Sequence, residues 1–124
     1  MSERKLLAGL DIGGSKVLAV AVDAGESDGR ARVIESARLN TGLGPEGVVD
    51  TATRALTALA ARLSGEGAGR ADPRDLFTGV GIGIPGLVDA ERGAITHAVN
   101  LGVGTGGLAL ADRLGRRLDL SVVV

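Results

Sequence analysis

The 124-residue chain contains no cysteine, tryptophan or tyrosine, and has a single phenylalanine and a single histidine. Without cysteine, it carries neither a disulfide framework nor a thiolate metal site. The scarcity of aromatic rings removes the platforms on which nucleic-acid bases stack. Its 14 basic and 15 acidic residues give a net charge of −1, so no basic footprint for nucleic acid is visible. We therefore expect no nucleic-acid partner for this segment.

The chain also lacks a long apolar segment. Its first apolar run begins at Leu6 and is interrupted by Asp11, which is too early for a signal peptide or a membrane span. We therefore expect a cytoplasmic protein without a membrane partner. Glycine, by contrast, is abundant: it accounts for 21 of the 124 residues, more than twice its usual share of ~7%. Most glycines interrupt apolar runs, which predicts many tight turns within one folded domain.

The most informative stretch lies near the start, where two short apolar runs flank a polar centre. Residues 6–10 and 17–22 are rich in Leu, Val and Ala, so they are predicted to be strands joined by a turn at Gly13-Gly14. Adjacent glycines can supply the positive φ angles of a tight hairpin. Such a hairpin directs several backbone N–H groups into one concavity that suits an anionic oxygen. Asp11, at the end of the first strand, could hold a metal ion there, which predicts a phosphate–Mg²⁺ site.

Two better-known phosphate motifs match only in part. Gly9 and Gly14 have the spacing of a Walker loop, but Ser15-Lys16 stands in reversed order and a predicted strand follows instead of the required helix. Residues 81–86 fit the dinucleotide pattern G-x-G-x-x-G. There the glycines alternate with apolar residues inside a predicted strand, and a proline forbids the helix that this pattern needs. Both motifs are therefore excluded.

Further along, the pattern predicts a strand, a helix and another strand. Residues 31–39 alternate as a third strand of a meander, with three apolar side chains on one face: Val33, Ala37 and Leu39. Pro45 suits the first position of a helix. Over residues 48–63, apolar side chains recur at helical spacing, which predicts an amphipathic helix packed on the sheet. Residues 78–84 form an apolar, glycine-rich strand, expected to run parallel to the first because a helical crossover precedes it.

The last third of the chain is predicted from shorter signals. Residues 89–93 form a turn that Asp89 stabilises, followed by an extended piece through Ile95 and a loop in which His97 is a polar residue. Residues 108–118 are expected to form a second helix that presents three arginines to solvent: Arg113, Arg116 and Arg117. A buried strand is predicted to begin at Ser121.

The predicted elements follow the order of half an actin-like, ribonuclease-H-like ATPase fold: three antiparallel strands, a helix, a strand, a helix and a strand. Within it, the chain resembles the ROK family of sugar kinases and sugar-responsive repressors. The motifs that carry the resemblance are Asp-Ile-Gly-Gly-Ser-Lys at 11–16, Gly-Ile-Gly-Ile-Pro-Gly-Leu-Val-Asp at 81–89 and Ala-Val-Asn-Leu at 98–101. The resemblance implies an α/β fold in which parallel strands extend a three-stranded antiparallel meander and helices pack on the sheet.

The resemblance also implies roles at the phosphates of ATP. Asp11 would bind Mg²⁺, directly or through water, and the amides of Gly13, Gly14 and Ser15 would face the phosphates. Lys16 would add charge neutralisation. Ser15 stands where the family often has Thr, a change that keeps the hydroxyl. From the residues alone, Asp11 could instead cap its turn and Lys16 could be a solvated lysine at a strand end.

A hexose substrate is implied at a second place. The corner at Gly86 would line the sugar pocket, where only glycine lets the backbone approach a hydroxylated ring. Asn100 would hydrogen-bond a sugar hydroxyl, because its amide can donate and accept. Asn in a loop is also a common turn residue, and the family often has a Trp after this motif where this chain has none.

The implied function is an ATP-dependent, glucokinase-like hexose kinase. The alternative is the sugar-sensing domain of a repressor without kinase activity, whose helix-turn-helix would precede the first strand; only residues 1–5 do so here. Residues 1–124 would be the amino-terminal domain of a longer protein, homodimeric when full length. The catalytic base, an Asp, is expected after Val124. The 124-residue chain alone is therefore expected to be inactive.

Overall fold

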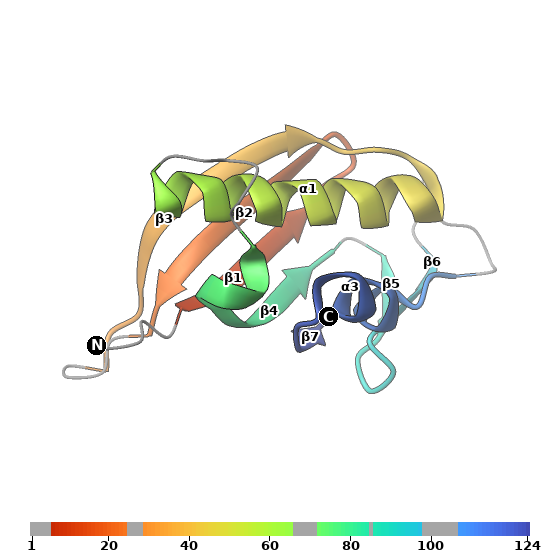
Figure 1. The fold of residues 1–124 in the computed structure, drawn as a ribbon. Helices are drawn as coiled ribbons and strands as arrows, with labels where there is room; N and C mark the ends of the chain where they lie inside the picture. The colour runs from red at the N-terminus through yellow and green to blue at the C-terminus, as the bar shows by residue number, and fades with distance from the viewer. Residues whose placement is uncertain (1–5, 25–28, 66–71, 85, 98–106) are drawn as a thin grey trace.

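A computed structural model describes residues 6–24, 29–65, 72–84, 86–97 and 107–124 of the chain. Figure 1 shows the described strands and helices along the chain, from red at the N-terminus to blue at the C-terminus. The strands are β1 Leu6–Ile12, β2 Lys16–Asp23, β3 Arg32–Asn40, β4 Phe77–Gly83, β5 Leu87–Asp89, β6 Ala94–His97 and β7 Val122–Val123. The helices are α1 Gly44–Ser64, α2 Pro73–Leu76 and α3 Leu110–Leu118.

Five strands form the main sheet in the order β3-β2-β1-β4-β7. The first three make an antiparallel meander. β4 then pairs with β1 in parallel, and β7 pairs with β4 in parallel. The predicted hairpin, the third strand and the parallel return after the long helix are therefore confirmed. β5 and β6 form a separate antiparallel pair, in which β6 was predicted as extended chain and β5 was not predicted.

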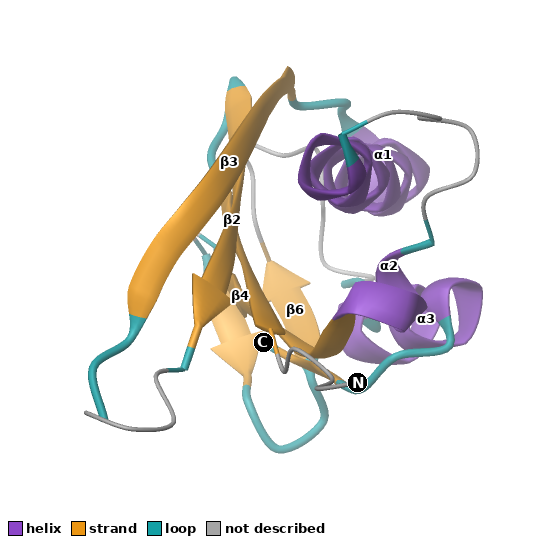
Figure 2. Ribbon diagram, turned by 60° about the vertical axis from the view of Figure 1, so that its left-hand side comes forward, coloured by secondary structure: helices purple, strands orange, loops and turns teal. Residues whose placement is uncertain are grey.

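The core lies on one face of the main sheet. Leu6, Ala8, Leu10 and Ile12 alternate along β1 with more exposed residues and are all buried, as expected for a strand with one covered face. Figure 2 shows α1, α2 and α3 on the same side of the sheet. The predicted amphipathic face of α1 is confirmed, because its apolar side chains at helical spacing are buried against the strands.

Local signals explain where the helices begin and end. Pro45 occupies the first turn of α1, as predicted, and Gly65 ends the helix with φ 83° and an N–H bonded to the Ala61 carbonyl. The short helix α2 was not predicted. The Asp72 carboxylate caps it by accepting a hydrogen bond from the Arg74 N–H at 3.1 Å.

Val33 is on the other face from the one predicted. Ala37 lies opposite Ala19 and Leu39 lies opposite Val17, on the face that α1 covers. The register then shifts so that Val33 pairs with Val22, and Val33 is 63% exposed. A bulge of one extra residue reverses the facing of the rest of a strand. The alternation was therefore correct for the second half of β3 and wrong for Val33.

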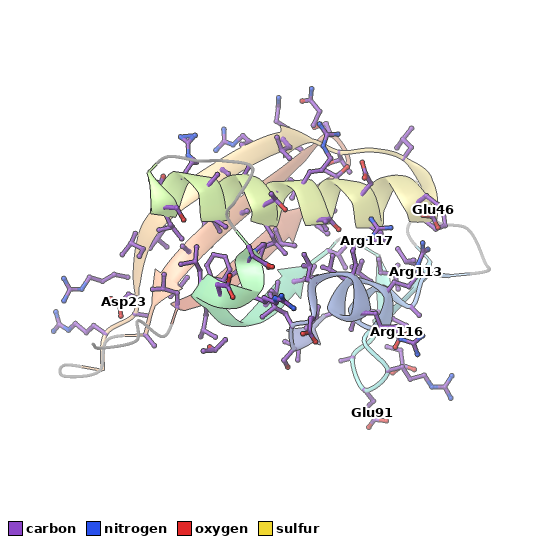
Figure 3. All side chains as sticks on the ribbon, viewed as in Figure 1. Asp23, Glu46, Glu91, Arg113, Arg116 and Arg117 are labelled. Atoms are coloured by element: carbon purple, nitrogen blue, oxygen red, sulfur yellow. The ribbon has the colours of Figure 1, made fainter. Side chains whose placement is uncertain are left out.

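Three predictions near the C-terminus also change. β7 is an exposed edge strand rather than a buried one, since Val123 is 65% exposed. His97 ends strand β6 instead of lying in a loop. Arg113 is half-buried and pairs with the Glu46 carboxylate of α1, and Figure 3 shows these two side chains next to each other. Arg116 and Arg117 are exposed, as predicted.

Candidate functional site

The predicted phosphate loop, Gly13-Gly14-Ser15, connects β1 to β2 at one end of the main sheet. The Gly13 N–H donates to the Lys16 carbonyl at 2.8 Å, which closes the end of the hairpin. Neither glycine has a positive φ, so the predicted positive-φ turn is wrong. Glycine instead relieves crowding at position 13, because a Cβ there would lie 3.1 Å from the Lys16 carbonyl oxygen, which is a tight contact.

The loop presents backbone donors that have no acceptor. Within the described part of the chain, the N–H groups of Gly14 and Ser15 make no hydrogen bond, nor does the Ser15 hydroxyl. Both residues are exposed. Exposed consecutive N–H groups in a turn form a concavity for an anion. The loop can therefore offer the Gly14 and Ser15 amides to an anionic oxygen. The Gly13 amide, which was predicted to face the phosphates with them, instead donates to the Lys16 carbonyl.

Asp11 lies two residues before this loop, on the face of the sheet that the helices leave open. Its neighbours across the sheet are Leu18 on β2 and Gly83 on β4. Gly83 has no side chain, so this flank of the carboxylate stays open. Asp11 is exposed and has no hydrogen bond or ion pair with any described residue. Its carboxylate is therefore not occupied with capping a turn.

Lys16 begins β2 and brings a positive charge to the same end of the sheet. Its ammonium donates to the Asn40 side-chain oxygen at 3.2 Å across the β2–β3 pair. Both side chains are exposed, and no described carboxylate forms an ion pair with Lys16. A neutral amide partner leaves the full charge available to an anion beside the loop.

The described residues fit a metal that arrives with a ligand rather than a dedicated metal centre. Among them, no group of three or more histidine or acidic side chains could hold an ion. Asp11 is the carboxylate nearest the loop in sequence. Mg²⁺ usually keeps several waters and binds through one or two carboxylates together with substrate phosphates. One exposed aspartate beside an anion loop suits that arrangement.

The predicted sugar site is described only in part. Gly86 lies between β4 and β5, is exposed and has φ 133°. That backbone conformation strains any other residue. The φ of Gly86 therefore explains the presence of glycine here without reference to a sugar. Asn100 lies outside the described residues. The loop residues 11–16 are thus placed together, whereas the pairing of Gly86 with Asn100 stays a prediction.

Thr41 contacts the loop and was not singled out in the sequence. Its hydroxyl donates to the Gly13 carbonyl at 2.9 Å, and its N–H donates to the Ser15 carbonyl at 2.9 Å. The two partners lie in a loop that precedes Thr41 by more than twenty residues. A threonine after a predicted strand carries no local signal of such a contact.

Membrane insertion through a helix has no support in the structure, because none of the described helices is both long and apolar enough to span a bilayer. No protein-family model matches the chain. The chain is 32% identical over 125 residues to a glucokinase of Halalkalibacterium halodurans, and this alignment covers all of the chain and 34% of the relative.

Solved structures give the same result. A ROK family glucokinase from Streptomyces griseus, in complex with glucose and AMPPNP, is 30% identical and superposes with a TM-score of 0.72 over 96% of this chain and 32% of its own. A ROK family transcriptional regulator, homologous to the E. coli MLC protein, is 16% identical with a TM-score of 0.75 over 98% of this chain and 27% of its own. The second match shows the shared fold alone.

This chain spans about a third of the length of these relatives. The predicted α/β fold of the actin-like ATPases is confirmed by these neighbours and by the mixed sheet with its helices. Similarity in sequence and in fold thus leads to the family that the three motifs indicated, because the chain is similar over nearly its whole length to a ROK family glucokinase.

Proposed function

We propose that residues 1–124 are the amino-terminal domain of an ATP-dependent hexose kinase, with glucose as the first substrate to test. The observation that carries this proposal is the exposed Asp11 carboxylate beside a loop whose Gly14 and Ser15 amides are unpaired. The likeness to a glucokinase complexed with glucose and AMPPNP supports the choice of ligands. Phosphoryl transfer depends on positioning and charge neutralisation more than on covalent chemistry by the protein, and these residues can supply both.

In this proposal the loop binds phosphate oxygens of ATP. The Gly14 and Ser15 amides donate to them, and the Lys16 ammonium offsets their negative charge. Asp11 would hold Mg²⁺, directly or through water, and the ion would neutralise charge on the phosphates. The γ-phosphoryl group is transferred to a sugar hydroxyl oxygen while its bond to ADP breaks. The hydroxyl proton passes to a base, which we place after Val124 in the complete protein.

The sugar would bind near the corner at Gly86, with Asn100 hydrogen-bonding one of its hydroxyls. The complete kinase would be a cytoplasmic homodimer. These parts of the proposal derive from the family resemblance, and the first of them can be tested by replacing Asn100 with Asp or Ala and measuring sugar affinity by calorimetry.

The decisive experiment compares wild type with Asp11→Asn in the complete protein. ADP formation is measured with ATP, Mg²⁺ and a panel of hexoses. We expect sugar-dependent ADP production by wild type and a loss of turnover of about a hundredfold or more in the variant, the scale for a group that stabilises transition-state charge. The melting temperature should be unchanged, because Asp11 is exposed and makes no hydrogen bond or ion pair with described side chains.

Asp50→Asn is the matched control, because Asp50 is an exposed carboxylate on α1, away from the loop. Its turnover should equal that of wild type. Near-normal turnover of Asp11→Asn would refute the assignment of Asp11. Sugar binding by wild type in calorimetry, without any ADP formation, would favour the alternative, a sugar-sensing domain of a regulator.

A further inference from the structure

Thr41 connects the phosphate loop to the start of α1. It follows β3 directly and is partly buried. Its side chain donates to the Gly13 carbonyl and its backbone N–H to the Ser15 carbonyl, each at 2.9 Å. One residue therefore fixes two of the three carbonyl groups of the loop.

The direction of a carbonyl determines the direction of the next N–H. A peptide unit is planar and trans, so its C=O and N–H point in opposite directions. Because the Gly13 carbonyl faces Thr41, the Gly14 N–H faces away from it. Likewise the Ser15 carbonyl faces Thr41, and the Lys16 N–H faces away. Thr41 thus turns these two N–H groups toward the opposite side of the loop.

Thr41 is itself held by α1. The next residue, Gly42, donates its N–H to the Thr51 hydroxyl at 2.8 Å, and this hydroxyl donates to the Gly47 carbonyl at 2.7 Å. Thr51 is 4% exposed and is the only polar side chain classed as buried in the described part of the chain. Gly42 and Gly47 are in tight contact, because a Cβ on Gly47 would lie 2.7 Å from the Gly42 carbonyl carbon.

From these contacts we propose that Thr41 is a positioning residue that orients the phosphate loop for its anion. This inference rests on the proposed function of the loop and adds a residue that does not itself touch the phosphates. The hydroxyl of Thr41 is the part that matters, because it satisfies the Gly13 carbonyl. Without it that carbonyl is free to rotate, and the Gly14 N–H rotates with it.

The first test is steady-state kinetics of Thr41→Val in the complete protein. Valine keeps the shape of threonine but cannot donate. We expect the KM for ATP to rise about five- to tenfold, the equivalent of one net hydrogen bond, while the KM for the sugar stays unchanged. Thr41→Ser should restore the wild-type KM for ATP. Thr53→Val is the control, because the Thr53 hydroxyl bonds the Val49 carbonyl within α1, away from the loop.

The second test needs no catalysis. Backbone amide NMR signals of Gly14 and Lys16 are compared in wild type, Thr41→Val and Thr41→Ser, with and without added pyrophosphate. We expect the Gly14 signal to move in Thr41→Val and pyrophosphate affinity to fall by the same five- to tenfold, with recovery in Thr41→Ser. The Lys16 signal should change little, because the backbone N–H of residue 41 still donates to the Ser15 carbonyl.

The outcomes separate this inference from the proposed function. An unchanged Gly14 signal in Thr41→Val would overturn the positioning role, whether or not the protein is a kinase. The positioning role would also be overturned if Thr41→Val raised the KM for ATP and the KM for the sugar equally, or if Thr53→Val raised the KM for ATP as much as Thr41→Val does. Either result would show a general structural effect. If the Gly14 signal moves as expected in Thr41→Val but the wild-type protein forms no ADP, the proposed function is refuted and the positioning role is not.

Discussion

At the scale of single residues, glycine serves three different purposes near the candidate site. Gly13 leaves space for the Lys16 carbonyl, Gly83 leaves one flank of Asp11 open, and Gly86 has a φ of 133°. Sequence alone predicted the importance of the loop glycines but assigned the positive φ to the wrong ones. Local composition shows that a turn is present. The φ of each glycine depends on the hydrogen-bond partner of its carbonyl, and for Gly13 that partner is the distant Thr41 hydroxyl.

We predict opposite stability effects for two glycines of the motif at 81–86. Gly86→Ala should lower the free energy of unfolding by about 1–3 kcal/mol, because alanine is strained at that φ. Gly81→Ala should raise it by about 0.5–1 kcal/mol, since Gly81 lies in strand β4, has no positive φ and would meet no atom within 4 Å. Urea denaturation measures both. A stabilised Gly86→Ala variant would contradict the structural reason given for this glycine.

At the scale of elements, the sequence was most reliable where one pattern persists. The opening hairpin was predicted because two apolar runs flank a glycine turn, and α1 because its helical spacing continues through the element. The bulge in β3 was not, since it arises from pairing with β2 and leaves no mark in β3 alone. α2 and β5 were too short for their periodicity to be visible. The contact between Thr41 and the loop was missed for the same reason as the bulge, because it joins segments far apart in sequence.

The junction between β3 and α1 leads to a prediction that reverses the usual helix rule. Alanine is favoured over glycine inside a helix by about 1 kcal/mol. Gly47→Ala should nevertheless lower the free energy of unfolding, by about 1–2 kcal/mol, because its Cβ would lie 2.7 Å from the Gly42 backbone and overpacking costs ~1–3 kcal/mol. Denaturant unfolding decides this, with the exposed Asp50→Ala as a control expected to change stability by about 0.5 kcal/mol or less. A stabilised Gly47→Ala would show that this contact relaxes freely.

At the scale of the whole molecule, the described helices cover one face of the main sheet, and no described helix covers the other (Figure 2). Cross-strand pairs place Leu7, Val22 and Val33 in one row on the other face, because directly opposite residues share a face. Val123 lies on the same face, opposite Gly81. Leu7, Val33 and Val123 are 44%, 63% and 65% exposed. This apolar row is distinct from the polar end of the sheet, where Asp11 and Lys16 lie.

Exposed apolar side chains gathered on one uncovered face of a sheet promote association, so we predict that the 124-residue chain self-associates when it is purified alone. Sedimentation velocity should show a coefficient that rises with concentration in the micromolar to millimolar range. Leu7→Lys should suppress the rise, because it places a charge in the middle of the apolar row. Leu43→Lys is the matched control, since Leu43 is 69% exposed but precedes α1, away from this face. A wild-type chain that stays monomeric throughout would show that the open face is too weakly apolar to associate, and equal suppression by both variants would mean that net charge, not this row, controls association.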